Sequence, residues 1–140
     1  MKKERIMVIG CHALDYLSKS GGVISQAIRQ GSAAKVICLT CGERGEANAV
    51  WKEDAEATEE KVREIKRGEA MKAAKILGAD IEFMNFKDHC LEMSQEKIHK
   101  VSEKIREFAP NVIKIIVFMT KKKAHLPNTK QTGGLFSMLS

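Results

Sequence analysis

The chain has 140 residues and a formal net charge of +6, with 24 basic side chains against 18 acidic ones. With 44% hydrophobic and 30% charged residues, the composition is typical of a globular protein and excludes an intrinsically disordered one. The length is sufficient for one domain with its own hydrophobic core. The longest apolar stretch, residues 112–119, contains Lys114 and is far shorter than the roughly 20 residues that cross a membrane.

The N-terminal residues do not resemble a secretion signal, because only residues 6–9 are apolar before Gly10. We therefore expect a cytoplasmic protein without a membrane partner. In that compartment its four cysteines are expected to be reduced thiols and not disulfides.

The excess positive charge is concentrated at the C-terminal end. Residues 111–140 contain five lysines and no acidic residue, whereas residues 1–110 contain 19 basic and 18 acidic side chains. The three adjacent lysines, residues 121–123, leave open a second class of function, a nucleic-acid-binding module that contacts phosphates. Only Phe118 stands nearby to stack on a base, so this pattern is weak and we do not expect nucleic acid as the main partner.

Strand and helix patterns alternate along the chain. Short β-branched runs predict strands at residues 5–10, 34–40, 81–86 and 112–118. Helical spacing of apolar residues predicts helices at residues 15–30, 58–77 and 94–108, with residues 41–57 as a polar loop. Thr58 and Ser94 are expected N-caps, and Gly78 is an expected C-cap. This order predicts the α/β class, with a parallel sheet flanked by helices.

Apolar residues at helical spacing also predict which helix faces pack inward. For the two longest helices these residues are Leu17, Val23, Ile24, Ala27 and Ile28, then Val62, Ile65, Met71, Ala74, Ile76 and Leu77.

Ligands of such sheets bind where the strands end, which directs attention to residues 10–15, 40–46 and 85–90. The first of these loops lacks the glycine spacing of a dinucleotide site. It carries His12 and Asp15, and an imidazole and a carboxylate at this spacing can bind one divalent cation. The alternative is that His12 packs in the structure and Asp15 only caps the following helix.

Four sequence blocks occur in order: VIGCHALD, Gly21-Gly22-x-Ile24, VICLTCGERGE and IKRGEAMKAAKILGADIEFMNF. Over about residues 5–113 they resemble the PIG-L/LmbE-like de-N-acetylase superfamily. The GCHxxD opening and the GERGE loop are most similar to the branch that includes 4-oxalomesaconate hydratase.

The resemblance implies a Rossmann-like domain that holds zinc, or another divalent metal, through His12, Asp15 and a more distant histidine. In the deacetylase branch, an acidic residue beside the aspartate ligand is the general base for attack on an acetamide. Here that position is Leu14, which cannot accept a proton. We therefore favour a hydratase that adds water to a small unsaturated dicarboxylate, and keep a zinc N-deacetylase of an N-acetylated sugar as the alternative. The sequence assigns no catalytic acid or base.

Five residues are candidates for binding the small-molecule substrate. They are Glu43, Arg44, Glu46, Arg67 and Asp88. An arginine such as Arg44 can bind a substrate carboxylate through two parallel hydrogen bonds. The alternative for all five is a set of self-paired surface charges, which contribute little to stability.

The resemblance divides the chain into an α/β domain over residues 1–113 and a basic tail over residues 114–140 that matches no block of the family. We expect the first part to be an incomplete N-terminal portion of the family domain, with the tail arising from truncation or a shifted reading frame. His125 is the one tail residue that could supply the missing ligand. An apolar edge left by the missing strands would favour self-association into a homo-oligomer.

Overall fold

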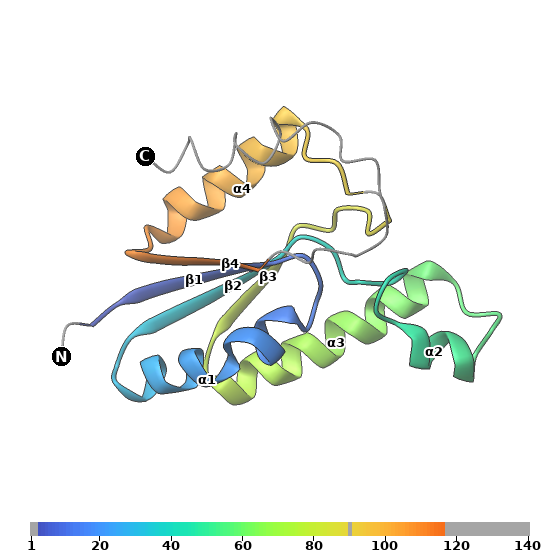
Figure 1. Cartoon of the computed structure of the whole chain (residues 1–140), viewed down its shortest axis with the longest axis horizontal. Helices are drawn as coiled ribbons and strands as arrows, with labels where there is room; N and C mark the ends of the chain where they lie inside the picture. The colour runs from blue at the N-terminus through green and yellow to red at the C-terminus, as the bar shows by residue number, and fades with distance from the viewer. Residues whose placement is uncertain (1–2, 90, 117–140) are drawn as a thin grey trace.

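The computed structural model describes residues 3–89 and 91–116. The elements follow the predicted alternation (Figure 1). In chain order they are β1 (Arg5–Gly10), α1 (Asp15–Arg29), β2 (Ala33–Cys38), α2 (Asn48–Glu53), α3 (Glu59–Leu77), β3 (Asp80–Phe83), α4 (Gln95–Phe108) and β4 (Val112–Ile116). The short helix α2 lies inside the predicted polar loop, and β2 and β3 end earlier than predicted.

All strand pairs in the sheet are parallel, and the strand order is β3-β2-β1-β4. Helices α1 and α3 cover one face, and α4 covers the other (Figure 1). The predicted fold class, a parallel α/β sheet flanked by helices, is confirmed. The strand β1 lies in the interior of the sheet, where Ile9 is in register with Ile37 of β2 and Ile115 of β4.

Two apolar clusters fill the space on either side of the sheet. Because side chains alternate along a strand, Ile6 and Val8 pack on the side of α1 and α3, and Met7 and Ile9 pack on the side of α4. Both faces of β1 are therefore buried, which explains why its sequence is a continuous apolar run and not an alternating one.

The predicted inner faces of α1 and α3 are wrong at several positions. Leu17, Val23, Ile65, Met71 and Ile76 are exposed. Of the predicted residues, Ile24, Val62 and Ala74 are buried. The two helices also bury small residues that were not predicted, Ser20 and Gly21 on α1 and Ala70 on α3. Small side chains let two helices and a sheet approach closely, so burial here follows steric fit and not hydrophobicity alone.

The predicted helix ends are confirmed. The Thr58 hydroxyl accepts a hydrogen bond from the backbone N–H of Lys61 (3.2 Å), and the Ser94 hydroxyl accepts one from Lys97 (3.3 Å). Gly78 ends α3 with a φ of 79°, a left-handed conformation that glycine adopts without steric cost. Among the elements of residues 3–89 and 91–116, no helix is long and apolar enough to cross a membrane.

The cap at Thr58 gives a direct test of α3. Replacing Thr58 with Ala removes the acceptor for the Lys61 N–H and should lower the free energy of unfolding by about 1 kcal/mol. Urea denaturation followed by circular dichroism measures this loss. Thr58→Ser keeps the hydroxyl and should retain most of the stability; equal losses in both variants would show that the cap does not act as described.

Candidate metal centre

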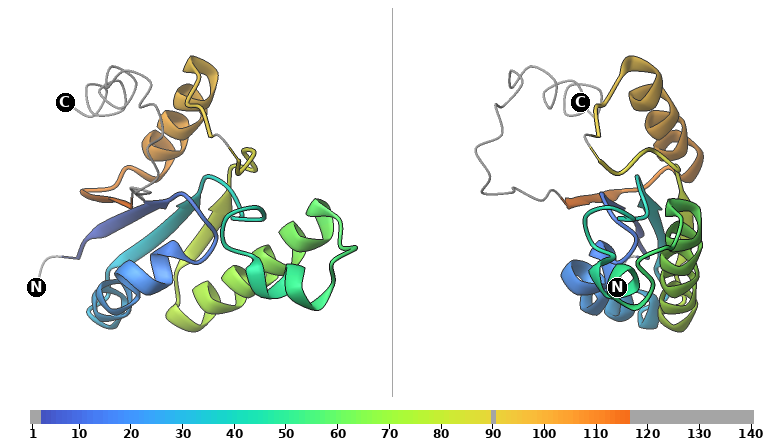
Figure 2. Two further views of the ribbon diagram at one scale, coloured as in Figure 1. Left: turned by 45° about the vertical axis from the view of Figure 1, so that its right-hand side comes forward. Right: turned by 90° about the vertical axis from the view of Figure 1, so that its right-hand side faces the viewer.

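The loops after β1, β2 and β3 lie at one edge of the sheet, because parallel strands all end on the same side (Figure 2). The chain proceeds from β1 to β2 and β3 on one side, and then crosses to β4 on the other side of β1. The loop that follows β1 therefore lies where the strand order reverses. In open α/β sheets this point is the usual position of a ligand site.

Three side chains at this edge have the chemistry of a metal site. The Nδ1 atom of His12 lies 3.3 Å from Oε1 of Glu46 and 3.7 Å from Oδ2 of Asp15. The three ligand atoms all lie within 4.8 Å of one another. Glu46, predicted as a substrate-binding residue, thus joins the two predicted metal ligands.

The position of Asp15 excludes the helix-cap alternative. Asp15 is the first residue of α1, whose N-cap is Leu14 without a side-chain cap. The Asp15 side chain is buried, and its Oδ2 atom accepts a hydrogen bond from the backbone N–H of His12 (2.8 Å). The carboxylate therefore turns back toward the loop and fixes its conformation around His12.

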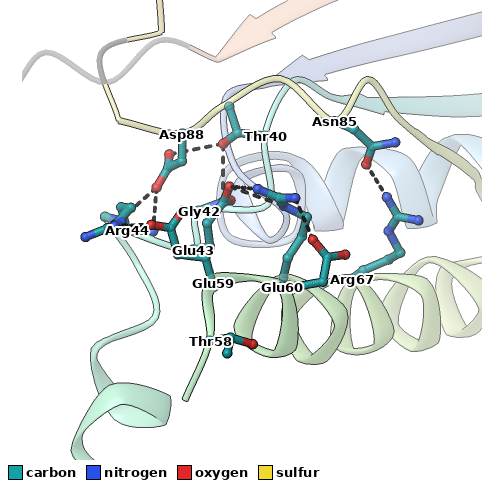
Figure 3. Close-up of polar contacts among 12 residues, drawn as sticks. Thr40, Gly42, Glu43, Arg44, Thr58, Glu59, Glu60, Arg67, Asn85 and Asp88 are labelled. Carbon is teal, nitrogen blue, oxygen red and sulfur yellow. Dashed lines mark hydrogen bonds and ion pairs between the residues drawn. The ribbon is translucent and has the colours of Figure 1, made fainter. Parts of the chain in front are cut away.

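Asp88 lies on the other side of the imidazole. Its Oδ1 atom is 3.1 Å from Nε2 of His12 and 3.1 Å from the hydroxyl of Thr40. Its Oδ2 atom accepts hydrogen bonds from the backbone N–H groups of Arg44 and Gly45, both at 2.8 Å (Figure 3). Asp88 thus joins the loops that follow β1, β2 and β3.

These contacts shift the pKa of both partners. Burial lowers the pKa of His12, but the hydrogen bond with Asp88 and the charges of Glu46, Asp15 and Asp88 raise it by more, so that it lies above 6.5. Burial raises the pKa of Asp88, but the hydrogen bonds from His12 and the two backbone N–H groups lower it by more, to well below its usual range. Asp88 is therefore ionised at neutral pH.

Gly42 shapes the turn that brings the second loop to His12. Its φ of +72° is one that glycine adopts freely, and an added Cβ would lie only 3.2 Å from the Cβ of His12. Its N–H donates to the Thr40 hydroxyl (3.2 Å), which is also within 2.8 Å of the carbonyl of Cys11. The loop therefore packs directly on the imidazole.

Glu43 occupies an interior position. Its side chain is fully buried, and its Oε1 atom accepts hydrogen bonds from Nη2 (2.8 Å) and Nε (3.3 Å) of Arg63. The indole N–H of Trp51 donates to its carbonyl (2.7 Å). Glu43 thus holds the loop against α3, and its predicted contact with substrate stays a prediction.

The two predicted arginines have different partners. The guanidinium of Arg44 forms an ion pair with Glu59 at the start of α3. The guanidinium of Arg67 donates to the neutral side-chain carbonyl of Asn85 (Figure 3). It also lies 5.0 Å from the centre of the Phe83 ring. Within the described part of the chain, no carboxylate lies within ion-pair distance of Arg67.

Thr40, Arg63 and Asn85 belong to this network but were not predicted. Thr40 and Asn85 follow β2 and β3 closely, so a search for neutral polar residues beyond strand ends could have found them. Arg63 stands among other charged residues of α3, and no sequence signal separates it from its exposed neighbours. The predictions for His125, for residues 121–123 and for a strand reaching residue 118 lie outside the described residues.

Comparison with known proteins decides the family. The profile of the GlcNAc-PI de-N-acetylases, PIG-L, matches residues 7–132. The chain belongs to the PIG-L family. The matched range extends beyond residue 113, where we expected the resemblance to end.

Relatives include hydratases and an amidase. A 4-oxalmesaconate hydratase of Pseudomonas putida is 36% identical over 79% of this chain and 43% of its own length. The mycothiol S-conjugate amidase of Streptomyces coelicolor is 29% identical over 78% of this chain and 43% of its own length. The crystal structure of the P. putida 4-carboxy-2-hydroxymuconate hydratase GalB superposes with a TM-score of 0.75 at 34% identity, covering 79% of this chain and 45% of GalB. The chain thus spans less than half the length of these relatives.

The raised pKa of His12 predicts how pH affects the metal-free PIG-L chain. The folded state holds this proton more tightly than the unfolded state, so the stabilisation is fully present below pH 6.5 and is lost as the pH rises through the folded pKa. Urea titrations should show the free energy of unfolding falling over this range, and the fall should disappear in His12→Gln. The control His99→Gln removes an exposed histidine of α4 and should preserve the fall; a fall that persists in H12Q would contradict the assignment to His12.

Proposed function

We propose that this PIG-L chain forms part of a metal-dependent hydratase that adds water to a small unsaturated dicarboxylate. The observation that carries the proposal is the convergence of His12, Asp15 and Glu46, whose ligand atoms lie within 4.8 Å of one another. The edge of the sheet at which they meet is the usual ligand position of this fold.

The donor set fits zinc. One imidazole nitrogen and two carboxylate oxygens are ligands that Zn²⁺ takes in catalytic sites, where three protein ligands leave one position open. A zinc ion held by His12, Asp15 and Glu46 would lower the pKa of a bound water and polarise a substrate carbonyl. Burial of Asp15 and the contact of its carboxylate with the His12 N–H hold two of these ligands in place before a metal binds.

Leu14 supports water addition over amide hydrolysis. In the deacetylase motif the residue before the aspartate ligand is an acid that serves as general base. In this chain the side chain of Leu14 is apolar and packs against the core cluster beneath α1. The hydratase relative is also more similar to this chain than the amidase relative, at 36% against 29% identity.

Arg67 is the best candidate to bind a substrate carboxylate. Its guanidinium carries a positive charge opposite the neutral amide of Asn85, whereas Arg44 and Arg63 are already paired with glutamates. An anionic ligand could therefore pair with Arg67 without breaking an existing ion pair. Asn85 follows β3, so Arg67 is held at the edge of the sheet where the strands end.

The metal proposal predicts binding of one zinc equivalent by the purified chain. Loss of a residue that hydrogen-bonds to a metal ligand typically lowers metal affinity roughly 10- to 100-fold. Loss of a ligand itself should lower zinc affinity by more than this. His12→Ala and Asp15→Ala should therefore lose zinc in competition with a chelator, and Glu46→Gln should weaken it. Glu53→Gln, a matched change at an exposed glutamate of α2, should have no effect. Equal zinc affinity in all four variants would refute the site.

The substrate proposal predicts that the zinc-loaded chain binds an unsaturated dicarboxylate. Arg67→Ala should weaken this binding roughly 10- to 100-fold in calorimetric titrations, because a hydrogen bond to a charged group contributes about 1.5–3 kcal/mol. Arg44→Ala should weaken it little, since that guanidinium is paired with Glu59. Release of acetate from an N-acetylated sugar, without binding of the dicarboxylate, would favour the deacetylase alternative instead.

A further inference from the structure

Asp88 uses both of its carboxylate oxygens inside the protein. Oδ2 accepts from two backbone N–H groups, those of Arg44 and Gly45, each at 2.8 Å. Oδ1 lies 3.1 Å from both the hydroxyl of Thr40 and Nε2 of His12. The side chain is 3% exposed, so Asp88 offers almost no surface to a substrate. These contacts give Asp88 a structural role in joining the loops, and its predicted role in binding substrate stays a prediction.

The two nitrogens of His12 face different groups. Nε2 faces Asp88, while Nδ1 faces Glu46 and Asp15, the other two members of the metal site. A metal bound between these side chains needs a deprotonated Nδ1, because only a nitrogen lone pair can coordinate a cation. The single remaining ring proton must then lie on Nε2, where an acceptor has to receive it.

We propose that Asp88 is a positioning residue that holds neutral His12 in the Nε2–H tautomer and thereby directs the Nδ1 lone pair toward the metal site. The inference rests on the metal site proposed above. A carboxylate behind a histidine ligand is a recurrent arrangement in metalloproteins, because it orients the ring and makes the coordinating nitrogen more basic. Here the carboxylate is itself held by two backbone N–H groups, so its position follows from the fold of the second loop.

The same contacts determine what asparagine would do at this position. The two backbone N–H groups require an oxygen opposite them, so the amide oxygen of Asp88→Asn must occupy the place of Oδ2. The amide NH₂ group must then face Nε2 of His12 as a donor. An imidazole nitrogen that receives a hydrogen bond carries no proton, so the proton moves to Nδ1 and blocks the metal-facing lone pair. In the serine-protease triad, the equivalent aspartate-to-asparagine change also produces the wrong histidine tautomer.

The test reads the tautomer directly. Two-dimensional ¹H–¹⁵N NMR of the metal-free protein, at a pH where the His12 ring is neutral, distinguishes a protonated Nε2 from a protonated Nδ1. We expect the Nε2–H form in the unmodified chain and the Nδ1–H form in Asp88→Asn. Chelator competition should show a 10- to 100-fold loss of zinc affinity in D88N.

A matched control separates this effect from a general loss of a carboxylate. Asp54 also accepts a backbone N–H, that of Glu56 (3.1 Å), and pairs with Lys61 (2.8 Å) on an exposed part of the chain. Asp54→Asn should change neither the His12 tautomer nor the zinc affinity. If D88N does not fold, the unmodified chain still decides the question, because an Nδ1–H tautomer in it overturns the proposal.

The outcomes also separate this inference from the proposed function. A chain that holds the Nε2–H tautomer but binds no zinc would support the role of Asp88 in orienting His12 and refute the metal site. If the unmodified chain binds zinc, and D88N shows the same His12 tautomer and the same zinc affinity, the metal site is supported. The role of Asp88 is then overturned.

Discussion

The contact between His12 and Asp88 is the interaction on which the rest of the site depends. It joins the loop after β1 to the loop after β3, and the backbone N–H groups of Arg44 and Gly45 add the loop after β2 to the same carboxylate. A buried, ionised carboxylate is costly unless its oxygens are hydrogen-bonded, so these donors must be present together. The three loops are therefore held as one unit around the imidazole.

The parallel sheet makes this junction geometrically available. Since all four strands run in the same direction, the loops that follow them meet at one edge. Apolar packing on both faces of β1 fixes the strand from which His12 and Asp15 extend. Leu14 packs half-buried against the same core, so the position that is acidic in the deacetylase motif is apolar here. Membership in the PIG-L family thus fixes the scaffold, while single positions beside the candidate metal site bear on the chemistry that we propose.

Much of the fold could be predicted because its signals are local. Continuous apolar runs mark the buried strands, and Thr58, Ser94 and Gly78 mark helix ends through contacts within one turn. Helix α2 was missed because its six residues are too few to show an apolar repeat at helical spacing. The loop that contains it is held by the hydrogen bond from the Trp51 indole N–H to the backbone carbonyl of Glu43. The buried faces of α1 and α3 were predicted only in part, at Ile24, Val62 and Ala74, because close packing there also selects small residues such as Ser20 and Ala70.

By itself, the sequence determined the parallel α/β scaffold, because continuous apolar runs and helical apolar spacing alternate along the chain. It also placed His12 and Asp15 three residues apart at the end of the first strand. Only the tertiary structure decided that Glu46 joins this pair, that Glu43 is buried against Arg63, and that Asp88 faces Nε2 of the imidazole. These residues come from separate loops and from α3. Their distances depend on strand order and loop conformation, which no local pattern encodes.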